Sequence, residues 1–217
     1  GVRLTATADL VTAVHETDVS LIAVGTPFDG NDIDLSYIRE AAHQIGRALR
    51  DKDGYHVVIV KSTVVPGTTE EVVLPALEVA SGKRAGEHFG VGMNPEFLRE
   101  GDAIADFMFP DRIVLGAESE FGKQVMSEVY RPLFLNKAPI LFTGRRTAEL
   151  IKYAANAFLA TKITFINEMA DLCEKVSADV QDVARGIGLD NRIGPKFLHA
   201  GPGYGGSCFP KDTLALL

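Results

Sequence analysis

Cys208 lies in a segment that places a thiol, an ammonium and a carboxylate close together in sequence: Gly201-Pro-Gly-Tyr-Gly-Gly-Ser-Cys-Phe-Pro-Lys-Asp212. A deprotonated thiol is a strong nucleophile. Lys211 would favour the thiolate, whereas Asp212 would disfavour it or take part in proton transfer. The glycines allow the backbone to turn tightly and to pass close to a ligand. The alternative is that Cys208 is a small buried apolar side chain, as lone cysteines often are.

Three glycines of this segment, Gly201, Gly203 and Gly206, also match G-x-G-x-x-G, the dinucleotide-binding motif. In that motif a strand precedes the glycines, a helix opens on them, and an acidic residue follows about 20 positions later. No strand pattern precedes Gly201, and the sequence ends at Leu217. We therefore reject the match as a dinucleotide site.

Lys152 and Asn156 are four residues apart in a stretch with helical periodicity, so they are expected on the same side of a helix. An ammonium and an amide held together among apolar residues could stabilise negative charge on a substrate oxygen. The alternative is a solvated lysine on a helix surface, which is the commoner state of this residue type.

Three segments that follow apolar strand patterns carry further polar candidates. They are Gly25-Thr26-Pro27, Ser62-Thr63, and residues 94–101 with Glu96 and Glu100. Ligands of open α/β sheets bind at the carboxyl ends of the strands, so these segments are expected to border one crevice. The alternative for the two glutamates is a place at the start of a helix. The five histidines are scattered and predict no metal site.

The spacing of apolar residues predicts alternating strands and helices over the first 143 residues. Strands are expected at 18–25, 55–61, 89–93, 112–116 and 140–143, and helices at 34–49, 69–80 and 120–133. Such alternation indicates a parallel sheet with helices on both faces. From 147 to 177 no Pro or Gly interrupts a pattern that is apolar nearly all round, which predicts one long helix. We expect it to be buried on most sides, in part by another subunit or by sequence outside this chain. A shorter helix at 180–186 and a structured loop at 192–212 are expected to follow.

The composition excludes several classes of protein. The chain has 217 residues, and 22 Lys plus Arg against 29 Asp plus Glu give a net charge of −7. This balance argues against nucleic acid or an anionic membrane as a partner but leaves a small anionic ligand open. The apolar runs are shorter than the roughly 18–20 residues that a membrane span needs. Two cysteines form no disulfide framework in a chain of this length, so a reducing, cytoplasmic setting is expected. The sequence begins with Gly1 and no targeting pattern, and we expect it to be cut from something longer.

Six segments occur in a specific order along the chain: VGTPF (24–28), KSTVVPGTT (61–69), NPEFLREG (94–101), FMFPDRIVLG (107–116), AELIKYAANAFLATKITFINE (148–168) and GPGYGGSCFPKD (201–212). Together they resemble the nucleotide-sugar dehydrogenases, the UDP-glucose/GDP-mannose dehydrogenase family. The fourth segment resembles the UDP-glucose branch. The resemblance implies two successive NAD-dependent oxidations of the C6 hydroxyl of UDP-glucose to a carboxylate, giving UDP-glucuronate, through a thiohemiacetal and a thioester on a cysteine.

The resemblance also implies roles for individual residues. Cys208 would be the nucleophile, and Lys152 and Asn156 would stabilise charge on the C6 oxygen. Water would be positioned and deprotonated by Thr63, Glu96 and Asp212, and which carboxylate is the base stays open. The residues implied on the NAD side are Val24, Gly25, Thr26, Thr63, Glu100 and Lys211. Those implied on the substrate side are Phe97, Leu98, Lys152, Asn156, Arg192, Phe197, Gly201, Gly203 and Gly205, with Arg192 reaching the substrate of a neighbouring subunit.

The implied fold is α/β: residues 1–143 would be the C-terminal part of a Rossmann-like NAD-binding domain, and 144–217 a central all-helical dimerisation domain. Full chains of the family begin with a strand, a G-x-G-x-x-G turn and an acidic ribose-binding residue, and end with a second α/β domain. None of these is present in this sequence. We therefore expect the 217 residues to fold and to form a homodimer through the long helix, but to have little activity alone. Three alternatives stay open: a dehydrogenase of GDP-mannose or a UDP-N-acetyl sugar, a cysteine acyltransferase or hydrolase without NAD, and a non-catalytic oligomerisation core.

Overall fold

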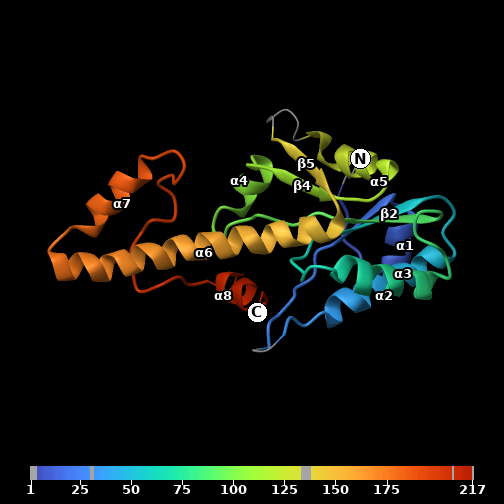
Figure 1. Ribbon diagram of the computed structural model, residues 1–217. Coiled ribbons are helices and arrows are strands. Elements are labelled where there is room, and N and C mark those ends of the chain that lie inside the picture. Colours follow the sequence, from blue (N-terminus) through green and yellow to red (C-terminus); the bar gives the residue numbers. More distant parts are fainter. Residues whose placement is uncertain (1–3, 30–31, 133–137, 207, 217) are drawn as a thin grey trace. The chain divides into compact units, whose positions relative to one another are not determined.

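The computed structural model describes residues 4–29, 32–132, 138–206 and 208–216. The chain divides into two compact units, Gly1–Lys152 and Tyr153–Leu217 (Figure 1). No helix in the described part of the chain is both long and apolar enough to cross a membrane.

Unit 1 contains a five-stranded sheet in the order β1-β2-β3-β4-β5. The strands are β1 (Val19–Ile22), β2 (His56–Val60), β3 (Phe89–Met93), β4 (Ile113–Gly116) and β5 (Ile140–Thr143). The helices of this unit are α1 (Leu10–His15), α2 (Ser36–Arg50), the π-helical turn η1 (Thr69–Val73), α3 (Leu74–Ser81), α4 (Ala103–Met108) and α5 (Glu120–Tyr130). Each predicted strand and helix of residues 1–143 is present, with ends shifted by a few residues. The sequence reading missed the short helices α1 and α4.

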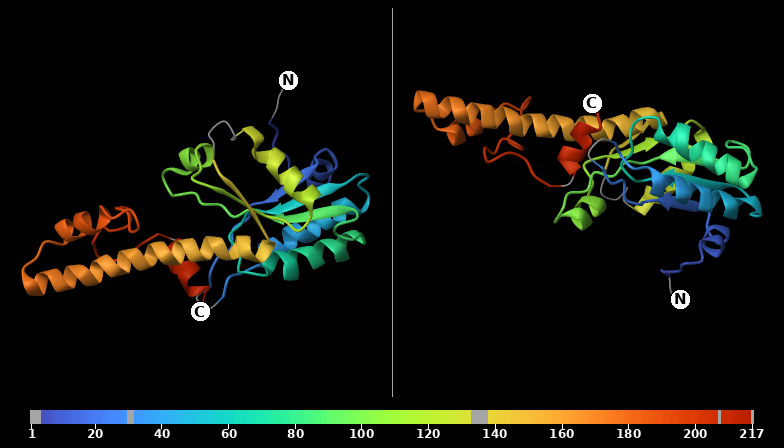
Figure 2. Two further views of the ribbon diagram at one scale, coloured as in Figure 1. Left: turned by 45° about the horizontal axis from the view of Figure 1, so that its top comes forward. Right: turned by 90° about the horizontal axis from the view of Figure 1, so that it is seen from below.

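Strand β2 is buried along its whole length and sends alternate side chains into two cores. Val58 and Val60 belong to a core that α2 and α3 complete, whereas Val57 and Ile59 belong to a second core with Met126 of α5. Successive side chains of a strand point to opposite faces, so these two cores lie on opposite faces of the sheet. Helices therefore cover both faces, as predicted (Figure 2).

The sheet is parallel except at one pair of strands. β1, β2 and β3 are parallel to one another, and β4 is parallel to β5, but β3 and β4 are antiparallel and meet through Met93 and Gly116. The predicted parallel sheet is therefore confirmed within the two groups of strands, and the β3–β4 pair departs from it. A parallel return needs a crossover helix packed on the sheet, and α4 buries none of its residues. The two parallel groups of strands meet instead at their carboxyl ends.

The long helix is α6 (Arg145–Val176), whose 32 residues span roughly 48 Å. It begins two residues before the predicted start, and Lys152 is its last residue in unit 1. Unit 2 adds α7 (Val180–Gly188) and α8 (Cys208–Leu214). The prediction of a loop through residue 212 is wrong for α8, since Pro210 lies in the first helical turn, where a proline is tolerated.

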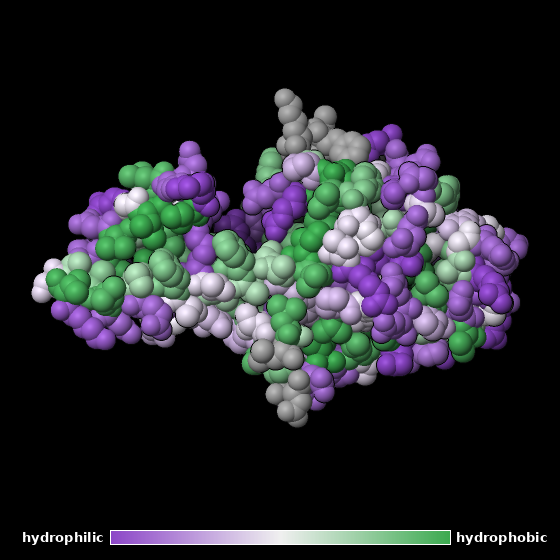
Figure 3. All heavy atoms as spheres, viewed as in Figure 1, coloured by the Kyte–Doolittle hydropathy of each residue, from purple (hydrophilic) through white to green (hydrophobic). Residues whose placement is uncertain are grey.

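Within one chain, α6 is not buried on most sides. Ala160, Ile166 and Cys173 are buried, but Phe158 is 65% exposed and Val176 is 62% exposed. Figure 3 shows apolar surface over the distal part of α6 and over α7. The expected near-complete burial is therefore not provided by the chain itself.

Candidate functional site

The loops that follow β1 and β2 are tied together by side-chain hydrogen bonds. Ser62 Oγ donates to the carbonyl oxygen of Val24 at 2.6 Å, and Thr26 Oγ1 donates to the carbonyl oxygen of Thr63 at 2.8 Å. Gly25 lies between them, and a Cβ added there would meet no atom within 4 Å. This part of the carboxyl edge therefore presents open backbone to which a ligand can come close.

Lys152 is not a solvated surface lysine. Its side chain is 5% exposed, and Nζ lies 3.2 Å from Oε1 of Glu96 in the loop after β3. The other carboxylate oxygen, Oε2, accepts the backbone N–H of Leu98 at 2.6 Å, which fixes the orientation of the carboxylate. The structure thus brings together two residues predicted for the site from positions 56 apart in the chain.

Asn94 fixes the start of the loop that carries Glu96. Its backbone N–H donates to Val60 in β2, and its Nδ2 donates to the carbonyl oxygen of Val114 in β4 at 2.9 Å. Its Oδ1 accepts from the hydroxyl of Tyr130 in α5. Burial raises the pKa of Tyr130 to about 12, so the hydroxyl stays a donor at neutral pH. The sequence reading missed this role, although Asn94 is the first residue after β3.

The ring of Phe97 lies under two cations. The Arg112 guanidinium is 3.8 Å from the ring centroid and Lys152 Nζ is 5.4 Å from it. Cations over an aromatic face are attracted by its quadrupole. Leu98 and Glu100, also predicted for the site, are exposed.

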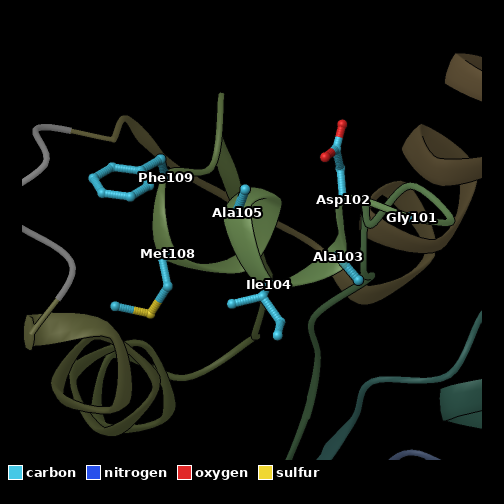
Figure 4. A pocket seen from close by; sticks show the side chains of 7 residues that line it. All are labelled: Gly101, Asp102, Ala103, Ile104, Ala105, Met108 and Phe109. Carbon is cyan, nitrogen blue, oxygen red and sulfur yellow. The ribbon is translucent and has the colours of Figure 1, made fainter.

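A shallow hollow of about 570 Å³ lies beside this loop, over α4. Figure 4 shows its lining, which is mostly apolar. The lining residues are Gly101, Asp102, Ala103, Ile104, Ala105, Met108 and Phe109. None of the residues predicted for the site lines it, so the hollow does not mark the candidate site.

Glu149, one turn before Lys152 in α6, is a buried carboxylate that the sequence reading missed. It accepts hydrogen bonds from the backbone N–H of Gly67 at 2.5 Å, from the N–H of Thr69 at 2.8 Å and from Thr69 Oγ1 at 2.6 Å. Burial raises the pKa of Glu149, and these hydrogen bonds offset part of that effect. The carboxylate thereby anchors α6 to the end of the loop that contains Thr63.

In unit 2 the predicted polar residues form a second group. Asp212 is 1% exposed, and its carboxylate accepts from Asn156 Nδ2 at 2.6 Å and from Lys211 Nζ at 2.7 Å. Cys208 begins the same helix α8 and is half-buried. A buried carboxylate one helical turn from a thiol, oriented by an amide and an ammonium, can hold a water molecule or move a proton.

Phe197 has a left-handed backbone conformation, with φ at 64°, which is uncommon for a residue other than glycine. Its ring centroid is 6.2 Å from that of Phe209, which in turn is 6.1 Å from Tyr204. The N–H of Gly201 donates to Asn167 Oδ1 of α6 at 2.9 Å. Through the contact with Asn167, the glycine-rich segment is attached to α6 within unit 2.

The remaining predicted residues of unit 2 are exposed. Gly203 has φ at 131°, a conformation that favours glycine, while Gly205 needs no such conformation. The side chain of Arg192 is 89% exposed and pairs with Asp190 at 2.6 Å. That pairing lowers the pKa of Asp190 and leaves one face of the guanidinium accessible.

Comparison with known proteins gives consistent results along the chain. Residues 1–134 match the NAD binding domain of the UDP-glucose/GDP-mannose dehydrogenase family, and residues 146–217 match its central domain. A curated UDP-glucose 6-dehydrogenase of Rhizobium meliloti (strain 1021) is 60% identical over 99% of this chain and 48% of its own length. The chain thus spans about half the length of the curated relatives it matches.

Solved structures agree with the sequence comparison. A UDP-glucose dehydrogenase from the hyperthermophilic archaeon Pyrobaculum islandicum has a TM-score of 0.89 at 47% identity, over 97% of this chain and 48% of that one. A ternary complex of GDP-mannose dehydrogenase from Pseudomonas aeruginosa has a TM-score of 0.83 at 44% identity, over 99% of this chain and 49% of that one. With both units matched in sequence and in fold, the chain belongs to the UDP-glucose/GDP-mannose dehydrogenase family.

Proposed function

We propose that this chain is part of an NAD-dependent enzyme that oxidises the C6 hydroxyl of UDP-glucose to the carboxylate. The observation that carries the proposal is the buried group of Asp212, Asn156 and Lys211 on the helix that begins with Cys208. The names of the relatives supply the substrate class. We further propose a boundary between the NAD-binding and central domains near residue 143, where β5 ends.

The proposed chemistry assigns one function to each group of residues. In the first oxidation the hydroxyl loses a hydride from C6 and a proton from oxygen, and Lys152 and Asn156 stabilise the negative charge on that oxygen. The Cys208 thiolate then adds to the aldehyde carbon, giving a thiohemiacetal after protonation of the oxygen. Loss of a second hydride from carbon and of the hydroxyl proton to solvent gives a thioester. Water held by Asp212, with Thr63 and Glu96, hydrolyses it and releases the thiol and the carboxylate.

NAD, when bound, would accept the hydride in each oxidation. The loops after β1 and β2 fit such a ligand because Gly25 leaves open space beside its backbone. Val24, Gly25, Thr26 and Thr63 would hold it there. Glu100 and Lys211 are proposed for the same cofactor. We propose a reducing, cytoplasmic setting for this chemistry, because it uses Cys208 as a thiol.

We also propose a homodimer formed through α6. The exposed apolar side chains of this helix, Leu150, Phe158, Phe165, Leu172 and Val176, support an isologous contact with a second copy. Sedimentation equilibrium should give about twice the chain mass of 23.4 kDa. Phe158→Lys should then give the monomer mass, and a monomeric wild type would contradict the dimer.

The test of the function is NADH formation by the gene product that contains these residues. We expect about two NADH per UDP-glucose and little turnover with GDP-mannose or a UDP-N-acetyl sugar. A preference for one of those sugars would change the proposed substrate but leave the proposed two-step oxidation in place. Thioester formation without NAD would instead favour a cysteine acyltransferase. The 217 residues alone are expected to turn over little. A normal rate for them would contradict this expectation.

A further inference from the structure

Lys61 is a second lysine beside Lys152 and Glu96, and the sequence reading assigned it no role. It is the residue directly after β2 and is half-buried. Its Nζ donates to the carbonyl oxygen of Asn94 at 3.5 Å. Asn94 begins the loop that carries Glu96, whose carboxylate lies 3.2 Å from Lys152 Nζ. Two ammonium groups and one carboxylate therefore share one region of unit 1.

The charges of this cluster act on one another. Burial lowers the pKa of Lys61 to about 8, the nearby charge of Lys152 lowers it as well, and the charge of Glu96 opposes both effects. In the described part of the chain, Glu96 and Lys152 are the two charged groups whose fields shift Lys61. With both lysines protonated, the cluster has one positive charge in excess.

A lysine ammonium has three N–H donors, so Lys152 can donate to a substrate oxyanion while it stays beside Glu96. Its charge is then shared between two anions, and the largely buried Glu96 carboxylate is less well compensated. A second cation near this carboxylate offsets that loss. Lys61 can supply it, because its ammonium contacts the base of the Glu96 loop at Asn94 and the charges of Lys61 and Glu96 act on each other.

We propose that Lys61 is a positioning residue of the active site, which balances the charge of Glu96 and keeps that carboxylate in place when Lys152 also donates to the substrate oxyanion. This inference rests on the proposed function, because it assigns Lys61 a part in the same reaction. Lys61 acts through Glu96 and Lys152 and need not touch the sugar.

The electrostatic part of the proposal is tested without turnover. The pKa of Lys61 can be followed in the 217-residue chain by NMR of lysine side chains labelled at Cε, with Lys61→Arg to assign the signal. We expect a midpoint of about 8, moved down in Glu96→Gln and up in Lys152→Met by about one unit each. Lys52→Met is the matched control. Lys52 is a buried lysine of unit 1 that donates to the carbonyl oxygen of Val14 near the end of α1, and its replacement should leave the midpoint of Lys61 unchanged. A midpoint that does not move in Glu96→Gln would overturn the proposal.

The catalytic part is tested in the gene product by steady-state kinetics. Lys61→Met should lower kcat about tenfold while the KM for UDP-glucose stays within about twofold. Lys61→Arg should restore kcat and keep it above pH 8, where Lys61 itself loses its proton but an arginine does not. Lys52→Met should lower stability and leave kcat and its pH profile unchanged. If the wild type turns over and kcat is unaltered in Lys61→Met, the role of Lys61 is refuted and the proposed function is not. A wild type that forms no NADH from any nucleotide sugar refutes the proposed function. The NMR titration would still test whether the charge of Glu96 raises the pKa of Lys61.

Discussion

The Glu149→Ala substitution should destabilise unit 1 strongly, because it removes the acceptor of three buried donors. These are the N–H of Gly67, the N–H of Thr69 and the hydroxyl of Thr69. A buried donor left without an acceptor costs about 1–3 kcal/mol. Water entering the vacated space would satisfy part of this need, so we take the lower end for each donor and expect a loss of about 3 kcal/mol. That is a large fraction of the roughly 5–15 kcal/mol that a typical protein has.

The assay is urea unfolding followed by far-UV circular dichroism, because the chain contains no tryptophan. The matched control is Glu71→Ala. Glu71 lies in η1 together with Thr69, but its side chain is 65% exposed and pairs with Arg146 at 2.6 Å on the surface. An exposed ion pair is worth less than about 1 kcal/mol, so the control should unfold near the wild-type midpoint. Equal losses in the two variants would refute the reasoning that the three buried donors depend on Glu149.

The same carboxylate should make stability depend on pH. The pKa of Glu149 is raised in the folded state above its ordinary value of 4.5, so the folded protein binds this proton more tightly than the unfolded chain. The resulting contribution is complete below pH 4.5 and is lost as the pH rises through the folded-state pKa. The free-energy difference between wild type and Glu149→Gln should therefore shrink as the pH rises. A difference that is independent of pH would contradict the raised pKa.

Three further substitutions test separate parts of the structure. Burial lowers the pKa of His56 from 6.5 to about 4, so its contribution to stability is present above pH 6.5 and is lost as the pH falls toward 4. Over this range the free energy of unfolding in urea should fall by about 3 kcal/mol more in wild type than in His56→Gln. Stability curves that run parallel with pH would contradict this. In Gly116→Ala the new Cβ would lie 2.8 Å from the Cβ of Ala148. This overpacking should cost about 1–3 kcal/mol of stability and lower the melting temperature. An unchanged melting temperature would show that β4 and α6 can move apart at this point. Cys208→Ser in the gene product should stop NADH formation after the first oxidation, since an alcohol is a much poorer nucleophile than a thiolate; a full yield of two NADH per sugar would exclude Cys208 as the nucleophile.

The sequence determined the local elements because their causes are local. The run of β-branched residues in β2, the apolar spacing in α2 and the uninterrupted stretch of α6 were sufficient to predict each element. Motif spacing identified the thiol segment around Cys208 and the lysine and amide one turn apart on α6. The family followed from six such segments in order, without any tertiary contact.

The direction of β4 was not predictable in the same way. A short apolar run such as that of β4 does not fix its direction relative to β3, which depends on whether the connecting helix packs on the sheet. Helix α4 forms, but none of its residues is buried. Whether a helix packs on the sheet is decided only when the sheet assembles. Helix α8 was missed because glycine and proline were read as a loop, whereas Pro210 is accommodated in its first turn.

The partners of the buried polar groups were decided by tertiary structure alone. Lys152 is equally consistent with a solvated helix face until Glu96 and the surrounding packing leave it 5% exposed. Glu149 meets Gly67 across 82 residues of chain, and Tyr130 meets Asn94 across 36. Periodicity and motif spacing carry no information over such separations. The sequence therefore specified which chemical groups are available, and the fold determined which of them lose water and pair, because desolvation and pairing depend on distances that only the folded chain sets.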